Sequence, residues 1–177
     1  KTDYENFQIL KRFWRSNESA ILSLCLISKN KLAFGQQDNK INIYEISSLK
    51  LIECIQAHED SVNCILTIST EIFASGSFDK TIKIWNCSNY RNLMVLKGHN
   101  SGICSLIYNM NENTLISGSN DQTIRIWSLE NKSCLIIIQG HKNKIWCLAL
   151  MPNNLLISGS FDKTIKVWNL NNLKIIH

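Results

Sequence analysis

One short segment occurs three times in this chain with almost the same residues. It reads FASGSFDKTIKIWN at residues 73–86, LISGSNDQTIRIWS at 115–128 and LISGSFDKTIKVWN at 156–169. The second copy begins 42 residues after the first, and the third begins 41 residues after the second. Self-similarity at a fixed period of this length indicates a repeat architecture, so the repeat decides the fold class.

A fourth and weaker copy lies one period upstream, where residues 33–45 read AFGQQDNKINIYE. Tyr44 stands there in place of the tryptophan of the other copies. The next three units are each preceded by a histidine that follows the aromatic residue of the unit before it by 14 residues; these are His58, His99 and His141. The repeat therefore extends over most of the chain.

Within each unit, the apolar residues alternate in short stretches of strand length. In the second unit we expect strands at 62–68, 72–75, 81–85 and 93–96, with a turn at 76–80 and a polar connection at 87–92. Four short antiparallel strands per repeat form one blade of a β-propeller. The predicted fold is all-β, with about four four-stranded antiparallel blades.

The units resemble WD40 repeats, whose signature is a GH pair, a central SGSxDxTIxxW element and a polar connection. The resemblance covers residue 17 to the end. It implies five parts: 1–16, the last strand of a preceding blade or a closing strand; 17–57, a degenerate repeat; 58–98 and 99–140, two repeats; and 141–177, a repeat truncated in its last strand.

WD40 propellers usually have seven blades, so the resemblance implies that the chain is part of a larger ring whose remainder is supplied by missing sequence. An open arc of four units would leave apolar blade faces and sheet edges bare. The alternative is a four-bladed ring, in which a strand from residues 8–15 completes the last blade.

The resemblance also implies a hydrogen-bonded set of His, Ser, Asp and Trp within each blade. A hydrolase triad is the competing interpretation, because it uses the same Ser, His and Asp. Three copies at one spacing, with an indole donor as fourth member, favour a structural network, so we expect no catalytic residue and no enzyme. The predicted sets are His58, Ser75, Asp79 and Trp85; His99, Ser117, Asp121 and Trp127; and His141, Ser158, Asp162 and Trp168.

The first unit departs from this pattern. It has Asn17 at the His position, Phe34 at the Ser position and Tyr44 at the Trp position, and it keeps only Asp38. We expect this blade to be the least rigid and to depend on apolar packing of Leu24, Leu26, Leu32 and Ile43.

Partner binding is expected in the loops, which the resemblance places beside the junction histidine and just before the Asp. Phe78 and Phe161 matter most, because exposed aromatic residues are enriched among interface hot spots. Each ring could instead pack onto its own blade. Lys142 and Lys144 would attract an acidic segment. The full set is Gln37, Glu59, Ser61, Phe78, Asn100, Gly102, Asn120, Lys142, Lys144 and Phe161.

Composition narrows the class of protein. The 177 residues are 45% hydrophobic and 19% charged, which is typical of one folded domain. The net charge is +5, but the Lys and Arg residues never form a run, so a nucleic-acid partner is not expected. No stretch of 18 apolar residues occurs, so membrane insertion is not expected either.

The seven cysteines are odd in number and include no C-x-x-C pair. This pattern favours a reduced protein of the cytoplasm or nucleus, with no metal site and no cofactor. Five of them lie inside apolar runs, where a free cysteine behaves as a small hydrophobic residue: Cys25, Cys64, Cys104, Cys134 and Cys147.

The function expected from this fold is a protein–protein interaction scaffold or assembly subunit of a multiprotein complex. The alternative is the substrate-recognition propeller of an F-box type ubiquitin ligase, because SGSNDQTIRIWSLENKSCL at 117–135 resembles the WD40 parts of such proteins. A phosphopeptide reader should show arginines on its loops, whereas Arg91 and Arg125 fall on a connection and a strand.

Overall fold

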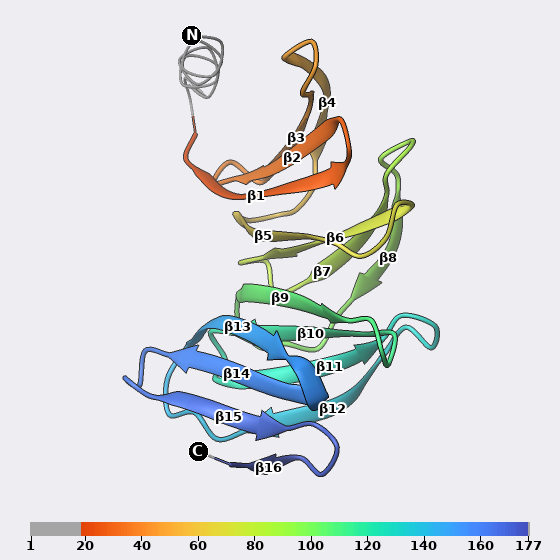
Figure 1. Ribbon diagram of the computed structural model, residues 1–177. Coiled ribbons are helices and arrows are strands. Elements are labelled where there is room, and N and C mark those ends of the chain that lie inside the picture. The colour runs from red at the N-terminus through yellow and green to blue at the C-terminus, as the bar shows by residue number, and fades with distance from the viewer. Residues whose placement is uncertain (1–18, 177) are drawn as a thin grey trace, which may run out of the picture.

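The computed structural model describes residues 19–176, which form four antiparallel sheets of four strands each (Figure 1). The first two blades consist of β1 (Ile21–Ser28), β2 (Lys31–Gln36), β3 (Lys40–Glu45) and β4 (Lys50–Gln56), then β5 (Val62–Thr67), β6 (Ile72–Ser77), β7 (Ile82–Asn86) and β8 (Asn92–Leu96). The third consists of β9 (Ile103–Asn109), β10 (Thr114–Ser119), β11 (Thr123–Ser128) and β12 (Ser133–Gln139). The fourth consists of β13 (Ile145–Met151), the 3₁₀ turn η1 (Pro152–Asn154), β14 (Leu155–Ser160), β15 (Ile165–Asn169) and β16 (Lys174–Ile175).

Every sheet has its strands in chain order, so each strand pairs with its neighbour in sequence. This is the meander expected of a propeller blade, and the all-β prediction with four four-stranded blades is confirmed. The first and last sheets lie at opposite ends of the molecule (Figure 1). The strand expected at residues 8–15, and Asn17, lie outside the described residues.

The turns between the second and third strands have one shared backbone feature. The third residue after the second strand has a positive φ of 69–72° in all four described blades. These residues are Asn39, Lys80, Gln122 and Lys163. A left-handed residue thus stands at the same place in each turn, so the four turns share this backbone conformation.

Gly76 was expected in a turn, but it lies in β6, which continues to Ser77. Its role is to make room. A Cβ on Gly76 would lie 2.6 Å from Cγ2 of Ile103, which comes from the first strand of the next blade. Gly35 and Gly118 receive Val62 and Ile145 in the same manner.

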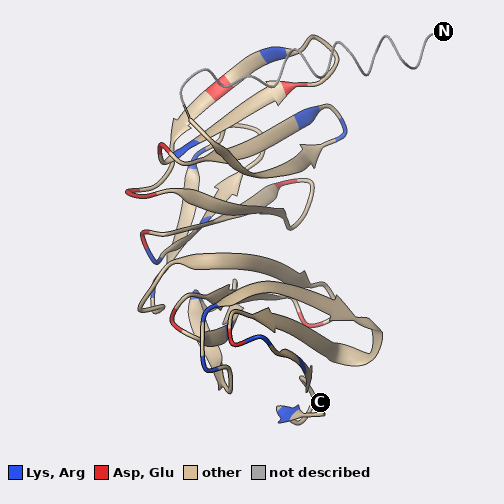
Figure 2. Ribbon diagram, turned by 90° about the vertical axis from the view of Figure 1, so that its left-hand side faces the viewer, with Lys and Arg blue, Asp and Glu red and all other residues tan. Residues whose placement is uncertain are grey.

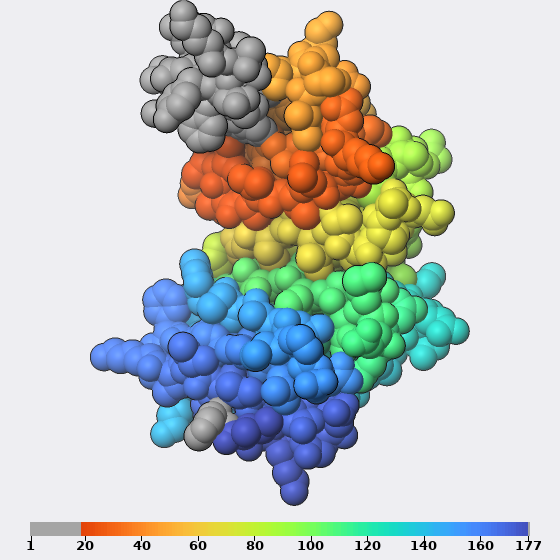
Figure 3. Space-filling view, viewed as in Figure 1, coloured from red at the N-terminus to blue at the C-terminus, as the bar shows by residue number. Residues whose placement is uncertain are grey.

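The hydrophobic core lies between adjacent blades. One cluster joins the first and second blades through Ile41, Ile43, Val62 and Ile65, and two similar clusters join the second to the third and the third to the fourth. The space-filling view shows the blades packed against each other in chain order (Figure 3). Each blade therefore depends on its neighbours for its core.

Three residues expected to be buried are not. Leu32 and Ile43 are buried as expected, but Leu24 and Leu26 are exposed on the first blade. They lie on the face that points away from the second blade, where none of the other described sheets packs. Cys147 is exposed on the opposite end face, on the fourth blade, for the same reason.

Candidate functional site

Four side chains form one hydrogen-bonded chain in each of the last three blades. In the third blade, Nδ1 of His99 lies 2.7 Å from Oδ2 of Asp121, and Nε2 lies 2.7 Å from Oγ of Ser117. The indole Nε1 of Trp127 donates to the same Oγ at 2.8 Å. The equivalent bonds in the other two blades, among His58, Asp79, Ser75 and Trp85 and among His141, Asp162, Ser158 and Trp168, measure 2.7–2.8 Å.

The direction of each bond follows from the groups present. An indole N–H can only donate, so Ser117 accepts from Trp127 and can give its own proton to Nε2 of His99. Nε2 is then unprotonated, and Nδ1 carries the proton that it donates to Asp121. The chain is thus satisfied when the histidine is neutral and the aspartate is charged.

The aspartates are held in the charged form. Burial raises the pKa of Asp121, but hydrogen bonds from His99, from the hydroxyl of Thr123 and from the backbone N–H of Asn100 outweigh burial. The resulting pKa is well below the usual range, and the same holds for Asp79 and Asp162. Burial, the largest cause, lowers the pKa of His99, against the opposing pull of Asp121.

These Ser, His and Asp contacts resemble a catalytic triad in their connections but differ in accessibility. Ser75, Ser117 and Ser158 are all 0% exposed, each beneath its own tryptophan. A nucleophile must reach a substrate, whereas these hydroxyls are already used as both donor and acceptor. The geometry is that of three structural clamps, each tying the loop before a blade to its second and third strands.

The first blade replaces this network with other contacts. Phe34 and Tyr44 stack with ring centroids 5.2 Å apart, in the positions of the serine and the tryptophan. Asn42 donates to the side chain of Gln36, and Lys40 lies 2.8 Å from Asp38. Ring stacking thus stands in place of the hydrogen-bonded chain.

The clamps position a set of loops at one end of the blades, here called the rim loops: the connections 57–61, 97–102 and 140–144 and the turns 37–39, 78–81, 120–122 and 161–164. In each of the last three blades, the clamp aspartate accepts a hydrogen bond from the residue after the junction histidine. All ten residues expected to face a partner lie on these loops. Gln37, Glu59, Asn100, Lys142 and Lys144 are exposed, and Asn120 is half-buried.

Ser61 and Gly102 differ from that expectation, because both are buried. The hydroxyl of Ser61 donates to the backbone carbonyl of Gln37 in the previous blade at 3.1 Å. Gly102 lies under the ring of Phe78, and a Cβ on it would collide with that ring. The Phe78 ring, 37% exposed, thus packs on the next blade and is only partly free.

Phe161 is the more accessible of the two aromatic residues, at 57% exposed. Its ring meets the exposed indole of Trp146 edge-on, with centroids 5.3 Å apart. Its backbone N–H donates to the carbonyl of Lys144 at 3.0 Å, and the N–H of Lys142 donates to Asp162. An exposed aromatic pair, Phe161 on a rim loop and Trp146 at the start of β13, therefore lies beside two exposed lysines in the fourth blade.

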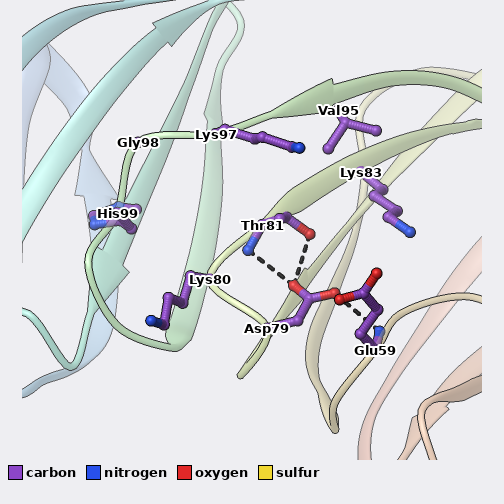
Figure 4. Close-up of a pocket in the computed structure, with 9 residues that line it drawn as sticks. All are labelled: Glu59, Asp79, Lys80, Thr81, Lys83, Val95, Lys97, Gly98 and His99. Carbon is purple, nitrogen blue, oxygen red and sulfur yellow. Dashed lines mark hydrogen bonds between the residues drawn. The ribbon is translucent and has the colours of Figure 1, made fainter.

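A hollow of about 420 Å³, which the sequence did not predict, lies on the rim between the second and third blades (Figure 4). Lys80, Lys83 and Lys97 line it, together with the carboxylates of Glu59 and Asp79. Lys80 and Lys83 come from the hairpin of β6 and β7, and Lys97 comes from the connection after β8, so formation of the blade brings Lys97 beside the other two. The repeat is the sequence pattern that could have pointed to this hollow. Lys83 and Lys166 occupy the same position in their repeats, and each donates to the backbone carbonyl of the residue before a junction histidine.

The charged residues of the described blades do not gather in one place. Basic and acidic residues are interspersed over the blades (Figure 2). Among residues 19–176 there is no group of three or more His, Cys, Asp or Glu side chains that could hold a metal ion. In the same residues, no helix has the length and apolar character needed to cross a membrane.

Comparison with known proteins gives consistent results. The family model "WD domain, G-beta repeat" (WD40) matches residues 49–86, 90–128 and 132–169. Relatives include Nuclear distribution protein nudF 2 of Penicillium rubens, 30% identical over 59% of this chain and 24% of its own length, and Cell division control protein 4 of Saccharomyces cerevisiae, 31% identical over 56% of this chain and 14% of its own length. Pre-mRNA-processing factor 19 of Bos taurus is 29% identical over 48% of this chain and 17% of its own length, so the chain spans a quarter or less of each of these relatives.

Solved structures agree on the fold. The computationally designed Ika4 protein superimposes with a TM-score of 0.77 at 31% identity, over 86% of this chain and 92% of its own. U3-55K superimposes with a TM-score of 0.83 at 21% identity, over 92% of this chain and 52% of its own, which shows the fold alone. With three matched repeats and four blades of this architecture, the chain belongs to the WD40 repeat family.

Proposed function

We propose that this chain is a protein-interaction scaffold or assembly subunit that binds its partners through the rim loops. WD40 repeat proteins generally act as interaction scaffolds in multiprotein complexes, and the family is typically not enzymatic. The observation that carries the proposal is the exposed pair Phe161 and Trp146 beside Lys142 and Lys144. Large aromatic residues left in water on a rigid surface are typical of binding hot spots.

The clamps support this role because they fix the loop backbone before a partner arrives. Asp162 holds the N–H of Lys142 at 2.9 Å, and Phe161 is tied to the carbonyl of Lys144. Because the loop backbone is already fixed, binding of a partner restricts few additional rotatable bonds. Less of the free energy of the contacts is then lost to ordering, and more of it remains as affinity. The loops act as the recognition surface, and the clamps act as their support.

The charges on the rim favour a partner segment that is acidic and carries an apolar residue. Lys142, Lys144 and Lys163 are exposed around Phe161, while the charge of Asp162 is already engaged by four hydrogen bonds. The hollow lined by Lys80, Lys83 and Lys97 lies on the same rim. A solvated lysine pair contributes little by itself, so the aromatic pair supplies affinity and the lysines supply orientation.

The test compares the partners of the parent protein and two variants by affinity capture from the native cells and quantitative mass spectrometry. The protein is used at its full natural length. The rim variant is Phe78→Ala/Phe161→Ala, and the matched control is Leu93→Ala/Leu135→Ala, which truncates two exposed aliphatic residues on the outer strands β8 and β12. Thermal melts establish first that all three proteins are folded.

We expect partners that bind the parent protein and the control to be lost from the rim variant, and to be released by added salt. Partners retained by the rim variant and lost by the control would contradict the proposal. They would place binding on the outer strands instead.

The ubiquitin-ligase alternative has less support than the scaffold function, because the arginines that could bind a phosphopeptide do not lie on the rim loops. Arg125 lies on β11 with its guanidinium over the ring of Trp127, 6.0 Å from the centroid, and close to Gly98. Arg91 lies in the connection between β7 and β8, which is not one of the rim loops. Binding of a phosphopeptide to the purified protein, lost when Arg91 or Arg125 is replaced, would favour this alternative.

We also propose that the protein works in the cytoplasm or nucleus. The support is its odd number of cysteines, of which all seven are free thiols. Fluorescence imaging of the tagged full-length protein tests this assignment, and a signal confined to the secretory pathway would contradict it.

A further inference from the structure

The hollow on the rim between the second and third blades is bounded by segments that all lie inside the chain. They are the connection before β5, the turn between β6 and β7, the end of β8 and the connection that leads to the third blade. The charged side chains of Lys80, Lys83, Lys97, Glu59 and Asp79 line it. Its volume of about 420 Å³ is large enough to receive a side chain of another protein.

The two carboxylates of the hollow differ in what they already bind. Asp79 accepts hydrogen bonds from His58, from the backbone N–H of Glu59, and from the backbone and hydroxyl of Thr81, at 2.6–3.1 Å. The carboxylate of Glu59 has no hydrogen bond or ion pair with another of residues 19–176. It lies beside Asp79 on one side of the hollow (Figure 4). Glu59 is therefore the carboxylate left to act on a ligand.

The three lysines differ in the same way. The amine of Lys83 donates to the backbone carbonyl of Ala57 at 2.7 Å, which holds it in place. The amines of Lys80 and Lys97 bind no other side chain or backbone group within residues 19–176, and both residues are exposed. Figure 4 shows the side chain of Lys97 extending toward Val95, across the hollow from Asp79. Two ammonium groups thus remain available to a ligand.

The charges within the hollow do not balance. Burial lowers the pKa of His99, so this histidine is neutral in its clamp. Burial raises the pKa of Asp79, but hydrogen bonds from His58 and Thr81 outweigh burial and keep the carboxylate charged. Three ammonium groups therefore face two carboxylates, and one positive charge is left over. One carboxylate from a ligand restores the balance, whereas a phosphate group brings a charge of about −1.5 to −2 at pH 7 and exceeds it.

The neighbouring blades repeat the backbone of this region but not its charges. The three lysines occupy the left-handed turn residue, the residue that pairs with the clamp serine, and the residue two places before the next junction histidine. The equivalents are Asn39, Asn42 and Gln56 in the first blade, and Gln122, Arg125 and Gln139 in the third. Glutamine therefore fits the positions of Lys80 and Lys97 in a blade of the same fold.

We propose that the hollow binds a carboxylate side chain from an acidic segment of a partner protein, with Lys80 and Lys97 in contact with the carboxylate and Lys83 fixed beside them. The inference rests on the proposed function, because it names a second contact for the partner that the rim loops bind. Val95, 38% exposed, offers an apolar wall to the aliphatic part of such a side chain, which inorganic phosphate lacks. Exposed ion pairs add little affinity, so the hollow selects for an acid at one place in the segment.

The first experiment locates the contact by chemical cross-linking. Complexes captured by the full-length protein are treated with a carbodiimide, which joins a carboxylate to an amine without a spacer and so links groups in direct contact. We expect linked peptides in which Lys80 or Lys97 is joined to an Asp or Glu of a partner. Partner links confined to lysines outside the hollow, such as Lys142 and Lys144, would overturn the inference.

The second experiment measures the affinity of the full-length protein for a synthetic peptide that covers the linked partner segment. Three forms are compared: the acidic residue intact, replaced by its amide, and replaced by phosphoserine. We expect the amide form to bind about threefold more weakly than the acidic form, with a smaller difference as salt is added. A phosphoserine form that binds more tightly than the acidic form would overturn the assignment to a carboxylate and favour a phosphopeptide.

Variants of the protein show which side chains are responsible. Lys80→Gln/Lys97→Gln introduces the residues of the third blade, so the fold is kept, and the difference between the acidic and amide peptides should disappear. Glu59→Gln removes the unpaired carboxylate and should tighten binding of the acidic peptide about twofold. The matched control is Lys50→Gln, an exposed lysine at the other end of the first blade, which should leave every affinity unchanged.

The outcomes separate this inference from the proposed function. If partners stay bound to Phe78→Ala/Phe161→Ala, the rim loops are not the binding surface, and both proposals fail. If partners depend on those two rings while Lys80→Gln/Lys97→Gln still prefers the acidic peptide as the parent does, the proposed function stands and the carboxylate site is refuted.

Discussion

At the scale of single residues, the clamp aspartate accepts hydrogen bonds from two segments of its blade. Asp121 accepts from His99, from the backbone N–H groups of Asn100 and Thr123, and from the hydroxyl of Thr123, at 2.7–3.0 Å. These bonds join the loop before the blade to the turn between its second and third strands. Removal of one side chain therefore affects both segments.

We expect Asp121→Ala to lower the free energy of unfolding by about 1–3 kcal/mol, because several donors lose their partner at once and water can replace only part of them. A thermal or denaturant melt measures the loss. The control is Glu130→Ala, an exposed carboxylate of the same blade, which should change stability by less than about 0.5 kcal/mol. Equal stabilities of the two variants would contradict the role of the clamp.

The clamps also predict how stability depends on pH. Because the pKa of folded His99 lies below the 6.5 of a free histidine, the unfolded chain takes up a proton first as pH falls, and stability declines below about pH 6.5. The pKa values of folded Asp79, Asp121 and Asp162 lie below that of a free aspartate near 3.9, so a second decline begins near pH 4.

Melting temperatures measured from pH 7.5 to 3 check both declines. His99→Asn should flatten the upper one, between pH 7 and 5, relative to its own value at pH 7.5. A profile as steep as that of the parent protein would assign the decline to other groups.

At the scale of the elements, two backbone positions decide how strands turn and how blades approach each other. The first is the left-handed residue of each turn, which is Asn39 in the first blade but Lys80 in the second. Asparagine tolerates this conformation better than lysine, because its short polar side chain bonds locally to the backbone.

Lys80→Asn should therefore stabilise the protein by about 0.5 kcal/mol, a rise of about 1–2 °C in the melting temperature. Lys97→Asn removes the same charge from the same hollow at a residue without positive φ, and should leave the melting temperature unchanged. A rise in both variants would point to charge, not to backbone conformation.

The second position is the glycine in the second strand of each blade, which in the first three blades makes room for the first strand of the next blade. Gly118→Ala would place a Cβ 2.8 Å from Cγ2 of Ile145 in the next blade, and we expect a loss of about 1–3 kcal/mol from overpacking. Gly159→Ala should cost less, because the atom it approaches is Sγ of Cys147, an exposed side chain that can rotate toward solvent. A loss as large at Gly159 as at Gly118 would contradict the role of Gly118 in making room for the next blade.

At the scale of the whole molecule, the four blades are chemically unequal. The last three have complete clamps, whereas the first relies on the stacked Phe34 and Tyr44 and leaves Leu24 in solvent. We expect backbone amides of β1–β4 to exchange hydrogen faster than those of β9–β12, because fewer buried contacts protect them. Hydrogen exchange followed by mass spectrometry tests this, and equal protection of both blades would show that stacking replaces the clamp fully.

The same contrast explains what the sequence could predict. The repeated SGSxDxTIxxW segments predicted the blades, and the resemblance to WD40 repeats implied the clamp residues, whose bonds form within one unit and recur at one spacing. Burial of Ser61 and Gly102, and exposure of Leu24 and Cys147, depend on which blade lies alongside. An alternating strand pattern shows that two faces differ, but not which of them has a neighbour.

The order of strands within each sheet has a consequence for synthesis. Since every strand pairs with the one made just before it, no sheet waits for a distant segment of the chain. Each blade can assemble as soon as its own residues leave the ribosome, and the next blade then completes the core on its exposed face. The apolar surface that awaits the next blade therefore lies on the blade made last, and it moves forward by one blade with each unit translated.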